Sequence, residues 1–476
     1  MRQYGVAFAL AVGTIGCVDL SSRSPAFAID FYVDGSCSVD GNGTGDGCAA
    51  SAGERGAWRD PQTCFSKARA GDTCYIKNGT YVTRNQSSGD PSVEGGFSIG
   101  ASGSASAPIT FKNYPGHSPL LANCPLGSTS YSACARPTIS APSRQYIVID
   151  GLRIFGGIWI YGDSPTVGQG SRGIVLQNLD ISQGWGEVDD GNWAGIFLQN
   201  MQGALIANNN IHDIAVLTGG GQQSSGTCVK LFQNADTIVE RNTCRTVNIA
   251  ESQAGGINDK AQGTRNIHRY NWIQDVNTCF NINNQLQSTG VQIYGNVCVG
   301  RAGTERPGVR LITNINGIDI HNNTFYGFAQ GLQIMSEGGP VTNVRFYNNI
   351  VAQCAMNVEA YQPGLVASNF NAWRGGVGYQ YGNRSYSSLG AFVSATGFDA
   401  ASSEADCRFV SAGSDFHLRG GSPCSGAGRA GGTAAGANVD RGAYGVTSCV
   451  GQNCAPPPPT AAKSADAAPE RRLVSN

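Results

Sequence analysis

Lysine, arginine and asparagine side chains recur at matching positions of short segments in the middle of the chain. Aligning these segments produces two columns of side chains, with one residue per segment in each column. The central part of the columns contains cations and amides but no acidic residue: Lys230, Asn258, Asn281 and Arg310 in the first, Lys260 and Asn283 in the second. Such a set suits an extended anionic polymer, because cations attract its charges and amides hydrogen-bond to it. An ordinary solvated surface is the alternative interpretation.

The segments that carry these residues are copies of an imperfect repeat. Each copy has two short alternating apolar stretches, and the second ends in Asn, a variable residue and an apolar residue. The closing apolar positions are 211, 244, 273, 298, 325 and 351, so successive copies are 33, 29, 25, 27 and 26 residues apart. This period indicates stacked units that cannot bury an apolar face alone, and it is too short for a propeller.

Alternation of apolar and polar residues identifies the repeated units as β-strands. Identical short strands stack best as parallel sheets, so we expect one all-β solenoid from about residue 73 to 445. The side chains expected to point inward are Val229, Leu231, Val309, Leu311 and Ile334. Asp259 should also point inward, where an unpaired carboxylate is costly, so we expect a local bulge or a partner such as a metal ion or Arg265.

One asparagine stands near the end of each repeat. Asparagine tolerates the left-handed backbone that corners need, and its amide can hydrogen-bond to the next coil. We therefore interpret these residues as structural: Asn209, Asn242, Asn271, Asn296, Asn323 and Asn349.

Composition agrees with a long, thin core and narrows the choice of partners. The chain has 66 glycines among 476 residues, and only 14% of its residues are charged. The net charge of −1 creates no general field toward nucleic acid or a membrane surface, so we expect neither as a partner. Since each coil needs only its neighbours, one elongated, monomeric domain is expected.

The N-terminus has the pattern of a secretory signal peptide, with Arg2, an apolar stretch and the cleavage motif Ala26–Phe27–Ala28. Residues 1–28 are therefore expected to be removed and the protein to be secreted, although Cys17 leaves a lipoprotein anchor open. The β-helix domain should occupy residues 29–447, and a Pro/Ala-rich tail residues 448–476. Asp60 followed by Pro61 predicts a short capping helix that runs to about Arg69.

Cysteines are numerous, as an exported chain allows. Five pairs are close in sequence and are expected to form disulfides: Cys37/Cys48, Cys64/Cys74, Cys124/Cys134, Cys407/Cys424 and Cys449/Cys454. The other five lie in the repeats, where we expect small buried thiols: Cys228, Cys244, Cys279, Cys298 and Cys354.

Several segments resemble landmarks of secreted bacterial right-handed parallel β-helix proteins of the pectate-lyase-like type. They are "AGDTCYIKNGTY" (70–81), "APITFKNYPG" (107–116), "SDFHLRGGSPCSGAG" (414–428) and "DRGAYG" (440–445). The resemblance covers nearly all of the expected mature chain and implies a right-handed parallel β-helix. Lyases of this fold cleave uronate polymers by β-elimination, which needs a carboxylate neutraliser, a base for the C5 proton and an acid for the leaving oxygen.

The segment "INDKAQGTRNIHRYN" (257–271) resembles the catalytic strand of chondroitinase-B-like alginate lyases, and Lys260 matches their catalytic lysine. Their arginine, one coil later, is matched by Asn283, which departs from the family. Neighbouring cations or calcium favour the neutral, basic form of such a lysine. The resemblance implies acidic calcium ligands just before it, and Glu251 and Asp259 are the candidates here.

A second lysine, Lys230, follows "VDDGN" (188–192), which resembles part of the calcium site of pectate lyases. Asp189 and Asp190 would be calcium ligands, while Trp193 stands where that family has a third aspartate. A solvated turn is the alternative interpretation of these two aspartates. Because calcium takes six to eight oxygens, they would supply only part of a site.

We therefore predict a protein that acts on an acidic, uronate-containing polysaccharide or binds it without catalysis. Lys260 and Lys230 are the alternative bases, Arg310 a third candidate catalytic residue, and Asn258, Asn281, Asn283 and His268 candidate substrate contacts. His212, His268 and His321 are expected near coil corners. A glycosidase fits less well, because the two columns lack the pair of carboxylates it needs.

Overall fold

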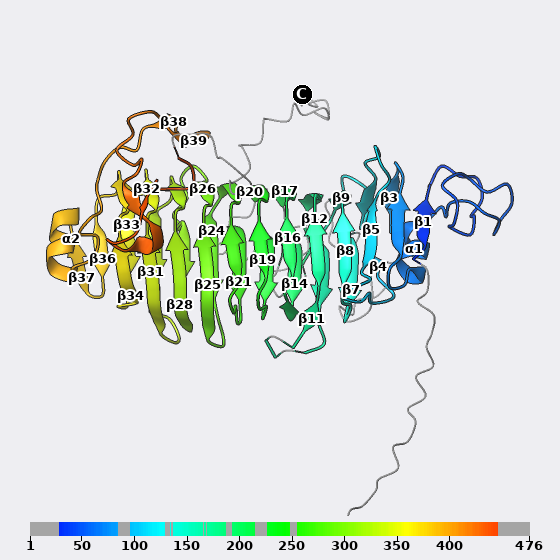
Figure 1. Ribbon diagram of the computed structural model, residues 1–476, viewed down its shortest axis with the longest axis horizontal. Helices are drawn as coiled ribbons and strands as arrows, with labels where there is room; N and C mark the ends of the chain where they lie inside the picture. Colours follow the sequence, from blue (N-terminus) through cyan, green and yellow to red (C-terminus); the bar gives the residue numbers. More distant parts are fainter. Residues whose placement is uncertain are drawn as a thin grey trace, which may run out of the picture.

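The computed structural model describes residues 28–83, 96–128, 134, 137–164, 166–167, 169–186, 193–214, 226–247 and 255–445. Within these ranges the chain winds into a right-handed parallel β-helix, which confirms the predicted fold. Figure 1 shows the coils side by side along the longest axis, between β1 (Asp30–Val33) and α2 (Leu389–Thr396).

Most coils contribute one strand to each of three long sheets, which we call sheets A, B and C. Sheet A contains β1, β2 (Thr73–Ile76), β5 (Ile109–Asn113), β8 (Ile147–Asp150), β12 (Ile174–Gln177), β16 (Leu205–Ala207), β19 (Ile238–Glu240), β22 (Ile267–Arg269), β25 (Ser288–Tyr294), β28 (Ile315–His321), β31 (Val341–Tyr347) and β34 (Leu365–Asn369). Sheet B contains β3 (Thr80–Val82), β6 (Leu120–Ala122), β9 (Arg153–Phe155), β13 (Asp180–Gln183), β17 (Asn210–Ile214), β20 (Thr243–Val247), β23 (Trp272–Val276), β26 (Val297–Gly300), β29 (Thr324–Tyr326), β32 (Ile350–Ala352) and β35 (Ala372–Arg374). Sheet C contains β4 (Phe97–Ser98), β7 (Ile139–Pro142), β10 (Ile158–Tyr161), β14 (Ala194–Gln199), β18 (Thr227–Phe232), β21 (Gly255–Lys260), β24 (Thr278–Asn283), β27 (Val309–Leu311), β30 (Gln330–Ile334), β33 (Met356–Ala360), β36 (Tyr379–Tyr381) and β37 (Arg384–Tyr386).

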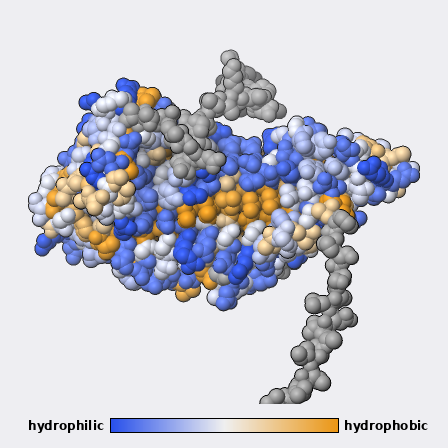
Figure 2. All heavy atoms as spheres, in the orientation of Figure 1, coloured by the Kyte–Doolittle hydropathy of each residue, from blue (hydrophilic) through white to orange (hydrophobic). Residues whose placement is uncertain are grey.

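The core is a continuous column of apolar side chains enclosed by the three sheets. All five residues predicted to point inward are at most 1% exposed, so the predicted register is correct. Burying each such side chain contributes roughly 1.5–3 kcal/mol, and the contribution is repeated coil after coil. The outer surface is mostly hydrophilic, with one apolar band near the middle of the face in Figure 2.

An asparagine ladder runs through the core, as predicted. Each ladder amide accepts a hydrogen bond from the backbone N–H of the preceding ladder residue, at 2.9–3.0 Å. The corner backbone differs from the prediction, because the left-handed residue is the one before the ladder asparagine. Examples are Asn208, Arg241 and Tyr270, with φ of 57°, 53° and 58°. The ladder continues one coil beyond the predicted set, to Asn371.

Both ends of the β-helix are covered by short helices. Helix α1 (Pro61–Lys67) is capped by Asp60, as predicted, although it ends two residues earlier than expected. Helix α2 begins at the Ser388 cap and packs Phe392 against Tyr379 of the last coil, with ring centroids 4.9 Å apart. These caps cover strand edges that would otherwise pair with other chains.

The solenoid begins and ends earlier than predicted. Strand β1 already pairs with β2, and the antiparallel β36–β37 pair closes the last coil. The chain beyond α2 packs back on sheet B, where Phe416 and Tyr444 lie against Trp272. The remaining short elements are β11 (Ser171–Arg172), β15 (Met201–Gln202), β38 (Phe409–Ser411), β39 (Asp415–Leu418), β40 (Gly428–Arg429), η2 (Ala430–Gly432) and β41 (Asn438–Val439).

Six disulfides stabilise the described part of the chain. Four are predicted pairs: Cys37–Cys48, Cys64–Cys74, Cys124–Cys134 and Cys407–Cys424. The prediction of free thiols in the repeats is wrong for Cys228–Cys244 and Cys279–Cys298, which join sheets C and B within single coils. Cys354 is buried and free, as predicted. The predicted Cys449/Cys454 pair lies outside the described residues.

The predicted signal peptide, except Ala28, and the predicted tail also lie outside the described residues. No helix in the described ranges is both long and apolar enough to cross a membrane.

Candidate functional site

The outer face of sheet C aligns the side chains found in the sequence. Strand pairing places Phe197, Lys230, Asn258, Asn281, Arg310 and Gln333 in one column. Gln199, Phe232, Lys260 and Asn283 form the second column. Neighbouring coils are about 4.8 Å apart, and alternate residues along a strand about 6.6 Å. We call the six residues Lys230, Asn258, Asn281, Arg310, Lys260 and Asn283 the cation–amide face.

The two candidate lysines differ in accessibility. Lys230 points away from the apolar core, as the predicted column requires, but it is 0% exposed. Lys260 is partly exposed, and Asn283 of the next coil is partly exposed beside it. A substrate reaching the face from solvent therefore meets Lys260 rather than Lys230.

Asn258 and Asn281 form the buried centre of the face. They are 0% and 2% exposed, and Asn281 Nδ2 donates to Asn258 Oδ1 at 3.4 Å. Among the described residues, Asn258 Nδ2 and Asn281 Oδ1 have no hydrogen-bond partner. Unsatisfied buried amides are rare, since each costs roughly 1–3 kcal/mol. Their predicted role as direct substrate contacts conflicts with this burial, so of the three candidate asparagines only Asn283 is accessible.

Arg310 lies two coils beyond Lys260 and begins a hydrogen-bonded chain along the first column. Its Nε donates to Gln333 Oε1 at 3.2 Å, and Gln333 Nε2 donates to Glu359 Oε2 at 2.6 Å. Burial lowers the pKa of the Arg310 guanidinium, and Arg306 acts in the same direction, while Glu337 opposes them. An arginine nevertheless stays charged. Arg310 is thus a half-buried cation with no ion-pair partner within the described ranges.

Asp259 and His268 meet inside the core, directly behind the cation–amide face. Both side chains are 0% exposed, and Asp259 Oδ2 lies 3.1 Å from His268 Nε2. Asn266 Nδ2 also donates to this oxygen, at 2.9 Å. The prediction of a partner is confirmed for Asp259 Oδ2, whereas Asp259 Oδ1 and His268 Nδ1 are buried without a partner among the described residues. The partner is not Arg265, which pairs with Asp236. A side chain at Gly263 would approach Asp259 Oδ1 to 2.4 Å, so glycine makes room for the carboxylate there.

This placement corrects two site assignments. His268 was predicted to contact the substrate. Its side chain is buried in the core, so it cannot reach a substrate on the outer face. Asp259 cannot reach a cation on that face either, because its carboxylate points inward.

The described residues do not assemble the predicted calcium site. Glu251, Asp189 and Asp190 lie outside them, in segments that lead into β21 and β14. Within the described ranges, the possible ligand atoms of one group of three residues lie close enough together to hold a metal ion. The three residues are Asp34, Cys37 and Cys48. The sulfurs of this group are joined in a disulfide, so it is not a ligand set either.

The other two repeat histidines have structural surroundings. His212 lies 3.1 Å from Asp180 on sheet B. His321 stacks between Tyr294 and Tyr347 on sheet A, with ring centroids 4.9 Å from each. These contacts give both side chains a structural role.

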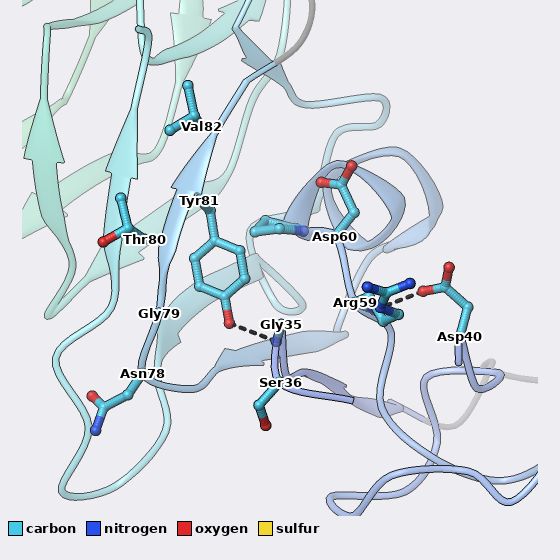
Figure 3. A pocket seen from close by; sticks show the side chains of 11 residues that line it. Gly35, Ser36, Asp40, Arg59, Asp60, Asn78, Gly79, Thr80, Tyr81 and Val82 are labelled. Carbon is cyan, nitrogen blue, oxygen red and sulfur yellow. Dashed lines mark hydrogen bonds between the residues drawn. The ribbon is translucent and has the colours of Figure 1, made fainter. Parts of the chain in front are cut away.

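A separate pocket of about 610 Å³ lies at the N-terminal end of the molecule (Figure 3). Its polar groups already serve the local fold. The Tyr81 hydroxyl accepts a hydrogen bond from the Gly35 N–H, Asp40 accepts one from the Arg59 N–H, and Asp60 caps α1. The pocket contains no counterpart of the cation–amide face.

The sequence alignment missed residues at both ends of the columns. Strand pairing extends the first column to Trp159 on one side and to Glu359 on the other. The alignment began at residue 195 and ended at residue 351, so it could not include β10 or β33. The signal was present in "IWIY" of β10, where aromatic and apolar residues alternate.

Comparison with known proteins supports the fold. No protein-family model matches the sequence, and no curated protein matches it. Among solved structures, pectate lyase Pel9A is similar with a TM-score of 0.54 and 13% identity, covering 89% of this chain and 97% of that one. The likeness is one of fold. A rhamnogalacturonan lyase gives a TM-score of 0.46 and 14% identity over 68% of this chain and 82% of that one. At such identities we carry over no residue role.

Proposed function

We propose that the protein is a polysaccharide lyase that cleaves a uronate-containing polymer at the cation–amide face. The observation that carries the proposal is the position of Lys260, a partly exposed lysine beside Asn283 and two coils from Arg310. No acidic residue occurs in either column on these coils. A neutral lysine among cations and amides is suited to take a proton next to a carboxylate.

Each accessible group of the face has a role in this reaction. Arg310 and Asn283 neutralise the uronate carboxylate, which makes the neighbouring C5 proton more acidic. Lys260 accepts that proton, the electron pair of the C5–H bond forms the C4–C5 double bond, and the C4–O bond breaks. The departing glycosidic oxygen takes a proton from the Lys260 ammonium or from water. The buried side chains of the face pack beside the accessible ones on the same strands and hold them in place. They are Lys230, Asn258 and Asn281.

The finer family assignment is part of the same proposal. The segment around Lys260 resembles chondroitinase-B-like alginate lyases, whereas Asn283 replaces their arginine. Arg310, one coil further, would then supply the missing cation. Calcium bound by Glu251, Asp189 or Asp190 would add positive charge at the carboxylate, and secretion would bring the enzyme to its polymer.

The test is a panel of alginate, polygalacturonate and chondroitin or dermatan sulfate, with added calcium or a chelator. A lyase produces an unsaturated sugar that absorbs ultraviolet light, which a hydrolase does not. Lys260→Ala should abolish the signal, and Lys230→Ala is the matched variant for the alternative, pectate-lyase-like site. Loss of turnover in Lys230→Ala alone would move the base to Lys230. No unsaturated product from any polymer would refute the lyase.

A non-catalytic polysaccharide-binding protein is the second candidate. It is favoured by one observation, the asparagine at position 283 where the resembling enzymes have a catalytic arginine. In that case a polymer of the panel would bind without being cleaved, and Lys260→Ala would weaken its binding modestly through loss of one cation.

A further inference from the structure

A group of aromatic side chains continues the cation–amide face toward the N-terminal end of sheet C. Trp159 and Tyr161 are alternate residues of β10, and both point out of the sheet and are partly exposed. Their ring centroids are 4.9 Å apart. Trp185 stacks on Trp159 at 5.3 Å, and Phe197 of the next coil lies 6.5 Å from it. We call these four residues the aromatic platform.

The platform lies in register with the columns that carry the proposed chemistry. Trp159 pairs with Phe197 and then Lys230 in the first column. Tyr161 is followed by Gln199, Phe232 and Lys260 in the second. Three coil spacings separate Tyr161 from Lys260, which is about 14 Å. One extended chain lying along the sheet can therefore touch both.

The side of the platform away from the cations is bordered by small residues. Trp159 pairs with Ser140 of β7, and Tyr161 pairs with Pro142. Neither neighbour carries an aromatic ring or a long side chain across the sheet. Trp159 Nε1 is buried without a hydrogen-bond partner among the described residues, so a ligand on the outer face does not reach it. The platform thus offers the partly exposed rings of Trp159 and Tyr161, packed against the buried rings of Trp185 and Phe197.

The chemistry of this group differs from that of the cation–amide face. Aromatic rings offer apolar surface to the C–H faces of a sugar ring. No cation of the two columns lies on β10 or β14, so this part of the face has no group to select a carboxylate. It can hold a sugar whatever its charge.

We propose that the aromatic platform is a distal sugar-binding subsite, which stacks on a unit of the polymer about three coils from the bond that is broken. The inference rests on the proposed function of the cation–amide face. It implies that the substrate is a chain long enough to span from Lys260 to Tyr161, bound along the long axis of the molecule.

The experiment measures binding by calorimetry and turnover by ultraviolet absorbance for polygalacturonate and alginate, each as the intact polymer and as its disaccharide. Trp159→Ala should weaken polymer binding by about tenfold, which corresponds to one lost stacking contact. The maximal rate should stay unchanged, because the reacting groups are intact. Disaccharide binding should also stay unchanged, because a disaccharide is too short to reach both places.

Two variants control for damage to the fold. Trp159→Phe keeps the stacking surface without the N–H, so it should retain most of the polymer affinity. Tyr75→Ala removes a partly exposed tyrosine from the outer face of sheet A and should leave affinity unchanged. If Trp159→Ala melts at a lower temperature than wild type, Tyr161→Ala replaces it as the test variant. Tyr161→Ala should likewise weaken polymer binding and leave disaccharide binding unchanged.

The outcomes separate the subsite from the lyase. Polymer binding that falls in Trp159→Ala without any turnover in wild type would support the subsite and refute the lyase. Turnover in wild type with unchanged polymer affinity in Trp159→Ala would refute the subsite alone. Equal losses for polymer and disaccharide would also overturn the subsite, and no binding of either polymer by wild type would overturn both.

Discussion

The outer faces of sheets A and C have the same backbone geometry but differ in how their charged side chains are arranged. On sheet A, basic and acidic residues of neighbouring coils pair, as in Arg269–Glu240 and Arg345–Asp319, at 2.6 and 3.1 Å. Beside these pairs runs a partly exposed apolar strip, visible in Figure 2: Val148, Val175, Leu205, Ile238 and Ile267. On sheet C, no acidic residue occurs at the positions of the cation–amide face, and two buried amides retain unsatisfied atoms.

The difference separates a structural face from a candidate site. Pairing across coils satisfies the charges of sheet A at little cost in free energy. Sheet C retains buried polar groups that destabilise the fold, and proteins keep such violations chiefly at functional sites.

The largest expected effect contrasts one cation from each face. Lys260→Ala should lower kcat/KM by about 10²–10⁴-fold, the usual contribution of a general base. Arg269→Ala on sheet A should leave kcat/KM within about twofold, because its partner Glu240 has no part in the reaction. Steady-state kinetics with the cleaved polymer measures both. Comparable losses in the two variants would remove the distinction between the faces.

The buried pair behind the cation–amide face should give the largest change in stability. His268→Val leaves the buried Asp259 carboxylate with the Asn266 hydrogen bond but without His268, and should lower the free energy of unfolding by about 3–5 kcal/mol. Asp259→Leu combined with His268→Val should recover most of this loss, because Leu231 and Ile282 occupy the equivalent inward positions on either side. Urea unfolding of the two variants measures the difference. A double variant no more stable than the single one would show that the coil requires the polar pair.

Arg310→Ala should weaken polymer binding and also slow the reaction, because Arg310 is proposed both to attract the polymer and to neutralise the uronate carboxylate. The loss of a charge-assisted contact corresponds to roughly 1.5–3 kcal/mol in kcat/KM. The difference from wild type should shrink as salt is added, because screening weakens the wild-type attraction. Kinetics over a range of salt concentrations tests this, and an effect confined to kcat would assign Arg310 to the chemical step.

The smallest expected effect is a pH dependence on sheet B. The hydrogen bond between His212 and Asp180 raises the pKa of His212, whereas burial lowers it. Burial alone would raise the pKa of Asp180, but the hydrogen bond and charge of His212 lower it.

The contribution of His212 to stability is present below its ordinary pKa of about 6.5 and is lost as pH rises through the raised value. The contribution of Asp180 is present above about pH 3.9 and is lost as pH falls through the lowered value. The pair should therefore stabilise the fold most between these pH values, by less than about 1 kcal/mol. Melting curves of His212→Asn should differ from wild type in this window, and an identical pH profile would show that the pair contributes nothing.

The fold could be predicted from sequence because each coil repeats one local rule. Alternation placed Val229 and Leu231 in the core, and recurrence of Asn242 and Asn271 indicated the ladder. The same rule fails on sheet A, where Ile238 and Ile267 face outward while His268 faces inward. Hydrophobicity alone therefore assigned His268 to the wrong environment.

The candidate site was only partly predictable. The columns follow from alignment, but the burial of Lys230 depends on the surroundings of the strand, which a repeat pattern does not describe. The Cys228–Cys244 disulfide joins opposite sheets of one coil, whereas the sequence argument compared only equivalent positions in different coils. Trp159 and Tyr161 were missed because β10 precedes the first well-aligned copy.

The central claim is that an acidic polysaccharide binds along the outer face of sheet C. The most direct measurement is a crystal structure of Lys260→Ala with a uronate oligosaccharide of the polymer that the wild-type protein cleaves. The account predicts sugar density along sheet C between Tyr161 and Arg310, with a uronate carboxylate at Arg310 and Asn283. Ordered sugar on sheet A or sheet B, with sheet C bare, would contradict it.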